Sequence, residues 1–318
     1  MPKKESKMKK ILIDMDIGDD IDDAIALYAA MRQGFEIVGV TTVFRNTIDR
    51  ARQTKKMLTE YKHGYETVPV FAGHGTPIGR TPVQYPHIPH YTADMEDNIY
   101  CPDGTEPDDA VDFIIDACHK YGKELIVIAI GPFTNIAHVI QKDPSALNSV
   151  YKTVIMGGAY FKQYADWNVI CDVTAADIMF RNLNNLECIG ADVTHLMVGE
   201  EDLYDNLLNY KGSERGHIYL SELCNLWKLD RPECKLLLHD PLVVYYVADT
   251  ALCEMRPASV AVITEGYAVG MTLNVDAYGK KEYFPSEYMN FDAEHKVLVA
   301  ATADRENFNR RIFKDFDI

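Results

Sequence analysis

Short apolar runs alternate with stretches of helical periodicity over the first two thirds of the chain. The runs are rich in Val, Ile and Leu, and they predict strands at residues 11–14, 37–43, 68–72, 125–130, 150–156 and 186–191. Apolar residues at three- and four-residue spacing predict helices at residues 22–32, 48–61, 108–119 and 133–141. This alternation predicts an α/β fold, in which a mostly parallel, Rossmann-like open sheet is covered by helices on both faces.

The rest of the chain departs from this alternation. Residues 197–250 are expected to be mostly helical, residues 258–275 to form strands, and residues 305–316 to form a closing helix. Residues 73–107 are rich in Pro, Tyr and His and weakly patterned, and a loop of that length is often functional. Because no repeat or low-complexity linker interrupts the sequence, we expect a single domain over residues 1–318. The helical segment 197–250 would form part of its pocket.

Polar residues that follow the predicted strands are the candidates for a functional site, because ligands of open α/β sheets bind at the carboxyl ends of the strands. The segments concerned are 14–23, 44–46, 131–135, 157–168 and 192–195. The first is the most acidic, since six of its ten residues are aspartates: Asp14, Asp16, Asp19, Asp20, Asp22 and Asp23.

Carboxylates this close together repel one another unless a cation or hydrogen bonds compensate. Oxygen ligands in this number suit calcium or magnesium rather than zinc, which prefers nitrogen and sulfur. An EF-hand loop does not fit, because its sixth position needs glycine and the sixth residue from Asp14 is Asp19. Capping of the next helix by Asp20 or Asp22 is one alternative. Another is a phosphatase of the haloacid dehalogenase type, whose nucleophile is the first Asp of an Asp-x-Asp after an apolar strand.

Composition narrows the partners and the compartment. The formal net charge is −16 and the pI is about 5.0, which argues against nucleic acid and anionic membranes as partners. Seven scattered cysteines without a CxxC pair indicate reduced thiols in a cytoplasmic protein. The basic start, MPKKESKMKK, is followed by only three apolar residues, too few for a signal peptide. No apolar run approaches the ~18 residues that a membrane span needs.

Six sequence blocks follow one another along the chain: ILIDMDIGDDIDDAIAL, TTVFRN, IAIGPFTNIA, MGGAY with DWN, GADVTH and LLLHDP. Together, and in this order, they resemble the blocks of the inosine-uridine-preferring nucleoside hydrolase family. The first is similar to the family's N-terminal signature, in which Asp-x-Asp-x-Gly precedes an Asp-Asp-Ala that opens a helix. This chain has two extra residues between the glycine and Asp22, and Asp166 and Trp167 stand where the family has Glu and Phe. The family's His-Gly-rich loop has no match in residues 73–107.

The resemblance implies a calcium site and assigns its residues. By position, Asp16, Asp23 and Asp240 would bind Ca²⁺ through their side chains, and Ile130 through its main-chain carbonyl. The residues expected around the ribose are Asp22, Asn46, Asp166 and Asn168. Asp16 would also act as general base toward a water molecule, and His239 as acid for the leaving base.

The activity that the resemblance implies is hydrolysis of the N-glycosidic bond of small ribonucleosides to ribose and free base, in purine or pyrimidine salvage. Such a reaction passes through an oxocarbenium-like sugar, which surrounding carboxylates stabilise. A family member that binds calcium and ribose without turnover is the alternative within the family. The resemblance also implies a homodimer or homotetramer. It leaves the base preference open, because Asp166 and Trp167 depart from the family where the base and the ribose 5′ side should contact.

Overall fold

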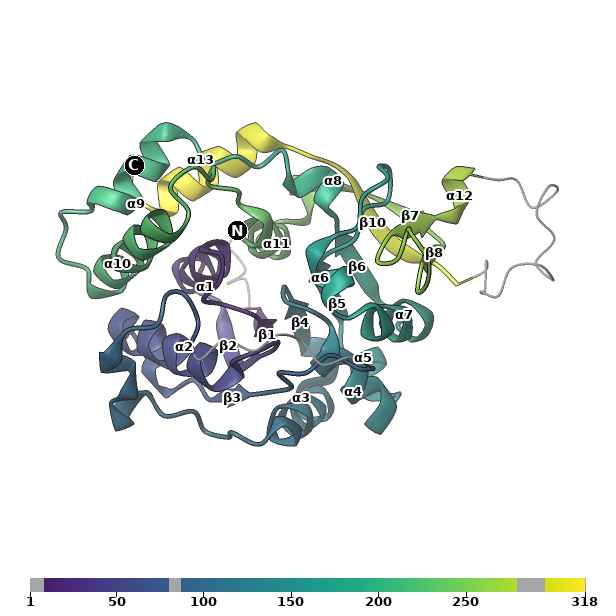
Figure 1. Cartoon of the computed structure of the whole chain (residues 1–318), viewed down its shortest axis with the longest axis horizontal. Coiled ribbons are helices and arrows are strands. Elements are labelled where there is room, and N and C mark those ends of the chain that lie inside the picture. The colour runs from purple at the N-terminus through teal and green to yellow at the C-terminus, as the bar shows by residue number, and fades with distance from the viewer. Residues whose placement is uncertain (1–8, 80–86, 279–294, 318) are drawn as a thin grey trace, which may run out of the picture.

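The structure is a computed structural model that describes residues 9–79, 87–278 and 295–317 (Figure 1). Within these residues the main sheet has eight strands in the order β3-β2-β1-β4-β5-β6-β10-β7. Their bounds are β1 Lys10–Met15, β2 Glu36–Thr42, β3 Val70–Ala72, β4 Leu125–Ala129, β5 Lys152–Met156, β6 Leu186–Ile189, β7 Cys253–Ala258 and β10 Val297–Ala303. All neighbouring pairs are parallel except β10 with β7. The predicted fold class is therefore confirmed.

Helices cover this sheet on both sides (Figure 1). The longer ones are α1 Asp22–Arg32, α2 Thr47–Tyr61, α3 Pro107–Tyr121, α4 Thr134–Lys142, α7 Val173–Asn182, α9 Glu201–Asn209, α10 Arg215–Asp230, α11 His239–Ala248 and α13 Arg305–Asp315. Short ones are α5 Ala146–Ser149, α6 Trp167–Cys171, α8 Ala191–Thr194 and α12 Val275–Tyr278. A separate two-stranded sheet pairs β8 Val260–Val262 with β9 Thr272–Asn274.

The two faces of the sheet bury different hydrophobic clusters, because side chains alternate along each strand. On β1, Ile11 and Ile13 join the cluster formed with α1, α2, α10, α11 and α13, whereas Leu12 joins the cluster formed with α3, α4 and α7. Every residue of β4 is buried, as its continuous apolar run predicted. The central strands are thus fixed from both sides, and their carboxyl ends form a rigid edge.

The elements differ from the prediction mainly near the carboxyl terminus. The alternating strands and helices of the first two thirds occur in the predicted order, and α1 has the predicted bounds. The prediction missed β7 and β10, although β10 inserts between β6 and β7 and extends the main sheet. In β7 only the two end residues are buried, so its sequence lacks an apolar run. Between β3 and α3 the described part contains short turns of 3-10 helix and an isolated bridge from Gly104 to Phe71; residues 80–86 lie outside it.

No helix in residues 9–79, 87–278 or 295–317 is long and apolar enough to span a bilayer.

Candidate active site

A cavity of about 740 Å³ opens where β1, β4 and β5 end. Eight of the nine residues assigned by resemblance line it: Asp16, Asp22, Asp23, Ile130, Asp166, Asn168, His239 and Asp240. They come from segments more than 200 residues apart, which the parallel sheet brings to one edge. Within the helical segment 197–250, Asp230 and Arg231 also line the cavity, next to the end of α10.

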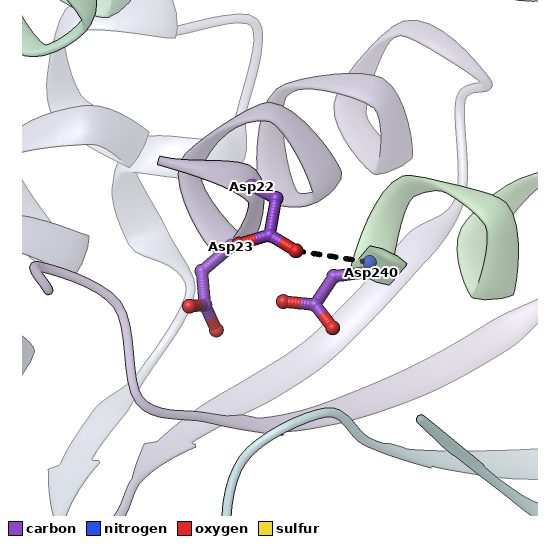
Figure 2. Close-up of side chains that lie close together, drawn as sticks. All are labelled: Asp22, Asp23 and Asp240. Atoms are coloured by element: carbon purple, nitrogen blue, oxygen red, sulfur yellow. Dashed lines mark hydrogen bonds between the residues drawn. The ribbon is translucent and has the colours of Figure 1, made fainter. Parts of the chain in front are cut away.

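Three buried carboxylates converge from two helices. Asp22 and Asp23 begin α1 and Asp240 lies in the first turn of α11, so both helix N-termini present acids to one point (Figure 2). One oxygen of each carboxylate lies within 4.8 Å of the others. The backbone N–H of Asp240 donates to Asp22 Oδ2 at 3.3 Å. The N–H groups and dipole of a helix N-terminus favour anions, which accounts for acids at these positions.

Burial raises the pKa of Asp22, Asp23 and Asp240 well above the usual range, and repulsion among the neighbouring carboxylates adds to it. Three carboxyls this close cannot all ionise without a compensating charge. A hard divalent cation would supply that charge through oxygen ligands. The donor set therefore fits a hard cation such as calcium or magnesium and does not fit zinc.

Asp16 lies beside this trio, directly after β1. Its backbone N–H donates to Asp23 Oδ1 at 3.2 Å. Burial raises the pKa of its carboxyl to about 7, and the charge of Arg50 opposes the shift. Gly131 approaches it closely, since a Cβ there would lie 2.9 Å from Asp16 Oδ1. The resemblance placed Asp16 on the metal and Asp22 on the ribose, whereas the compact trio contains Asp22; both assignments stay predictions.

The three remaining aspartates of the acidic segment have structural partners. Asp14 accepts hydrogen bonds from Thr41 Oγ1 at 2.6 Å and from Asn135 Nδ2 at 2.8 Å. Asp19 and Asp20 form the two-residue extension, to which the resemblance assigns no role. The alternative of helix capping is wrong, because no side chain caps α1. Asp19 accepts from Arg50 Nη2 at 2.7 Å, and Asp20 accepts from Arg231 Nη1 at 3.0 Å. Ion pairs thus compensate the extra acids.

Asp166 and Asn168 line the same cavity. Asp166 caps α6, because its carboxylate accepts from the backbone N–H groups of Asn168 and Val169. Burial raises its pKa to about 6, and these hydrogen bonds limit the shift. Asn168 Nδ2 donates to the carbonyl oxygens of Ile130 at 2.8 Å and Met156 at 3.2 Å. The Asn168 amide therefore fixes the ends of β4 and β5, and it orients the Ile130 carbonyl assigned to calcium.

His239 begins α11, next to Asp240. Its Nδ1 lies 2.6 Å from Thr194 Oγ1, and the ring meets His195 edge-on at 5.2 Å between centroids. Burial lowers the pKa of His239 to about 4, and His195 lowers it further. The imidazole is thus neutral at pH 7. If the Thr194 hydroxyl donates to Nδ1, the ring proton resides on Nε2.

Asn46 is the exception among the assigned residues. It precedes α2 and lies outside the cavity lining, where Arg45 stands instead. Sequence reasoning also missed Tyr164, His195 and Arg231, which line the cavity. Tyr164 and His195 fall in segments that follow predicted strands, so the strand-end rule pointed to their region but not to these side chains. Arg231 falls in the helical segment 197–250 that was expected to form part of the pocket, but nothing in the sequence singled out this residue.

Comparisons with known proteins agree with this geometry. The family model described as inosine-uridine preferring nucleoside hydrolase matches residues 11–310. Uridine nucleosidase 1 of Arabidopsis thaliana is 30% identical over 280 residues, 84% of this chain and 82% of the relative. The inosine-uridine preferring nucleoside hydrolase of Leishmania major is 29% identical over 278 residues, 83% of this chain and 87% of the relative.

The fold agrees as well. The solved structure of a plant nucleoside hydrolase superposes with a TM-score of 0.79 at 23% identity, covering 98% of this chain and 99% of that one. The expectation drawn from the sequence blocks is confirmed, and the phosphatase alternative loses its support. The chain belongs to the inosine-uridine preferring nucleoside hydrolase family, whose reaction is hydrolysis of the N-glycosidic bond of ribonucleosides.

Proposed function

We propose that this protein cleaves ribonucleosides to ribose and free base in a calcium-dependent reaction, with Asp16 as general base. The observation that carries the proposal is the convergence of Asp22, Asp23 and Asp240 beside Asp16 in a cavity large enough for a nucleoside. Drug-sized ligands occupy pockets of about 300–1,000 Å³, which is the range of this cavity.

Calcium would be held by Asp16, Asp23, Asp240 and the carbonyl of Ile130, with Asp22 close enough to contribute or to bind the ribose. When bound, calcium supplies positive charge that orients the ribose diol and eases deprotonation of a water molecule. Asp16 accepts the proton of the attacking water.

The cavity walls divide the remaining tasks. Asp22, Asp166 and Asn168 surround the sugar, and the two carboxylates favour the positive charge that develops there. Asn46 is included among the ribose contacts on the resemblance alone. Trp167 and Tyr164, which are about half exposed at 56% and 43%, offer ring faces to the base.

His239 assists departure of the base by donating a hydrogen bond. Its neutral imidazole carries one N–H, and the contact with Thr194 holds the ring in place. Because burial lowers its pKa to about 4, transfer of a full proton to the base would draw on a small imidazolium population at pH 7. We therefore assign His239 the role of hydrogen-bond donor to the leaving base, in place of the leaving-group acid that the resemblance implied.

Two further expectations rest on the resemblance alone: a homodimer or homotetramer, and a role in purine or pyrimidine salvage. The cytoplasmic location rests on the scattered cysteines and on the short apolar run after the basic start.

Ribose release tests the proposal. Inosine, uridine, adenosine, cytidine and nicotinamide riboside are incubated with wild type and with Asp16→Ala in calcium. Wild type should release ribose from at least one nucleoside, and Asp16→Ala should lose nearly all of that activity. If wild type binds calcium but cleaves none of them, the chain is the non-catalytic family member. Equal activity in Asp16→Ala would remove the role assigned to that residue.

A further inference from the structure

A fully buried arginine lies beneath the loop that carries Asp16. Arg50 is in the first turn of α2 and has no exposed surface. Its Nε donates to the Phe44 carbonyl at 2.8 Å, and its Nη1 donates to the carbonyls of Ile17, at 2.8 Å, and of Asp16. Its Nη2 donates to Asp19 Oδ2 at 2.7 Å. One guanidinium therefore ties the loop between β1 and α1 to the junction between β2 and α2.

The junction that Arg50 holds has an unusual backbone. Phe44 and Arg45 are consecutive non-glycine residues with φ of 70° and 58°. Left-handed backbone costs about 1–2 kcal/mol for each such residue, so it persists only where other contacts impose it. Here the two N–H groups donate to the carbonyls of His74 and Gly75, at 2.9 and 2.8 Å, and Arg50 holds the Phe44 carbonyl. The turn brings Arg45 Nη1 to 3.6 Å from Asp19 Oδ2.

Packing alone does not explain a charged side chain at this place. Burial of a guanidinium is costly, and the start of a helix disfavours positive charge. An apolar side chain of similar volume would fill the space without that cost. What it could not do is bond three backbone carbonyls and one carboxylate at once, which the planar five-donor guanidinium can. Asp19 belongs to the two-residue extension, so the extension supplies the anion that Arg50 needs.

We propose that Arg50, paired with Asp19, is a positioning residue for the reaction: it fixes the main chain at Asp16 so that this carboxylate faces Asp23 and the metal. Arg50 binds the Asp16 carbonyl, and the Asp16 N–H donates to Asp23. The orientation of Asp16 is thus set from both sides of its backbone. This inference rests on the proposed function, but calcium binding tests it separately.

The test compares Arg50→Lys and Asp19→Asn with Arg52→Lys. Arg52 is a matched control, because it lies on the same helix and donates to the Met95 carbonyl at 2.9 Å, away from Asp16. Lysine at position 50 keeps the charge but cannot make the forked set of bonds. For each protein, kcat and KM are measured at saturating calcium, calcium affinity is measured by titration calorimetry, and thermal unfolding is followed.

Loss of a partner that orients a metal ligand typically costs about 10–100-fold in metal affinity or activity. We expect Arg50→Lys to lower kcat and calcium affinity by about 10-fold or more, with KM for the nucleoside changed less than about twofold. Asp19→Asn should lower kcat and calcium affinity by a smaller factor, and Arg52→Lys should change neither kcat nor calcium affinity.

The proposal is overturned if Arg50→Lys lowers only the unfolding temperature while kcat and calcium affinity match those of Arg52→Lys. If Arg50→Lys does not fold, Asp19→Asn decides in the same way, because it removes the anion that holds the Arg50 guanidinium against the Asp16 carbonyl. If wild type cleaves no nucleoside, the proposed function fails, and calcium affinity alone decides the role of Arg50.

Discussion

Asp240→Asn should stabilise the metal-free protein while abolishing its response to calcium. The Asp240 carboxylate lies within 4.8 Å of those of Asp22 and Asp23. Without a cation its charge is unfavourable, and burial and repulsion raise its pKa well above the usual range. Asparagine keeps the shape, removes the charge and offers an N–H donor to the two neighbouring carboxylates. A substitution that damages function should thus improve the fold.

The magnitude follows from the distance. Two unit charges 4.8 Å apart repel by about 3.5 kcal/mol at an effective dielectric constant of about 20. Protonation of the carboxyls relieves part of this repulsion, so we expect Asp240→Asn to raise the free energy of unfolding by about 1–3 kcal/mol at pH 8. For 318 residues the unfolding entropy converts this gain to a rise of about 1.5–4.5 °C in Tm.

The assay is thermal unfolding at pH 8, in chelator and in millimolar calcium. Calcium at 100 times its Kd should stabilise wild type by about 2.7 kcal/mol and leave Asp240→Asn unchanged. Asp172→Asn is the control: Asp172 is equally buried but accepts hydrogen bonds from Thr134 Oγ1, Ile78 N and Ala175 N, so this variant should lose stability and keep the calcium shift. The reasoning is refuted if Asp240→Asn unfolds below wild type in chelator and retains the wild-type calcium shift.

Three further predictions concern the same cavity. Gly131→Ala should lower kcat about 10-fold or more, since the added Cβ would displace Asp16. The control Gly34→Ala has open space around the added Cβ but a φ of 69°, so it should lower stability without changing kcat. Measuring kcat and Tm for both variants distinguishes the two effects. Trp167→Ala should raise KM about 2–10-fold through lost stacking and leave Tm nearly unchanged, and an unaltered KM would exclude base contact. The metal-free Tm should fall as pH rises from about 4 to about 7. Asp14 and Asp16 have pKa values of about 7 in the folded state and about 3.9 in the unfolded state, so the folded state binds more protons in that interval. A Tm that rises between about pH 4 and about pH 7 would contradict these pKa shifts.

Local patterns predicted the parts of the fold that depend on local physics. The periodicity after the acidic segment predicted α1 to the residue, and the apolar run at β4 predicted a strand buried on both faces. β7 escaped prediction because its pairing with β10 stabilises it, and that partner is more than 30 residues further along the chain. An antiparallel edge strand with exposed charges carries no pattern of its own.

In the site, too, the sequence predicted what depends on neighbouring residues and missed what depends on contacts between distant segments. Six aspartates in one segment predicted a hard cation, because their mutual repulsion is local. Spacing could not show that Asp240 joins Asp22 and Asp23, since helices α1 and α11 pack against each other only in the folded chain. Nor could it show that Asp19 pairs with Arg50, 31 residues away, because that pair depends on how α2 packs over the loop. The family resemblance assigned the residues, and the structure supplies the contacts that orient them.

Ribose release as a function of free calcium tests the central claim most directly. Wild-type enzyme stripped of metal with chelator is titrated with calcium, and ribose release from its preferred nucleoside is followed beside calcium binding. We predict no release in chelator and a rise that follows the occupancy of one calcium site, with both curves lost in Asp240→Asn. Full ribose release in chelator, or release in Asp240→Asn equal to wild type, would contradict the account.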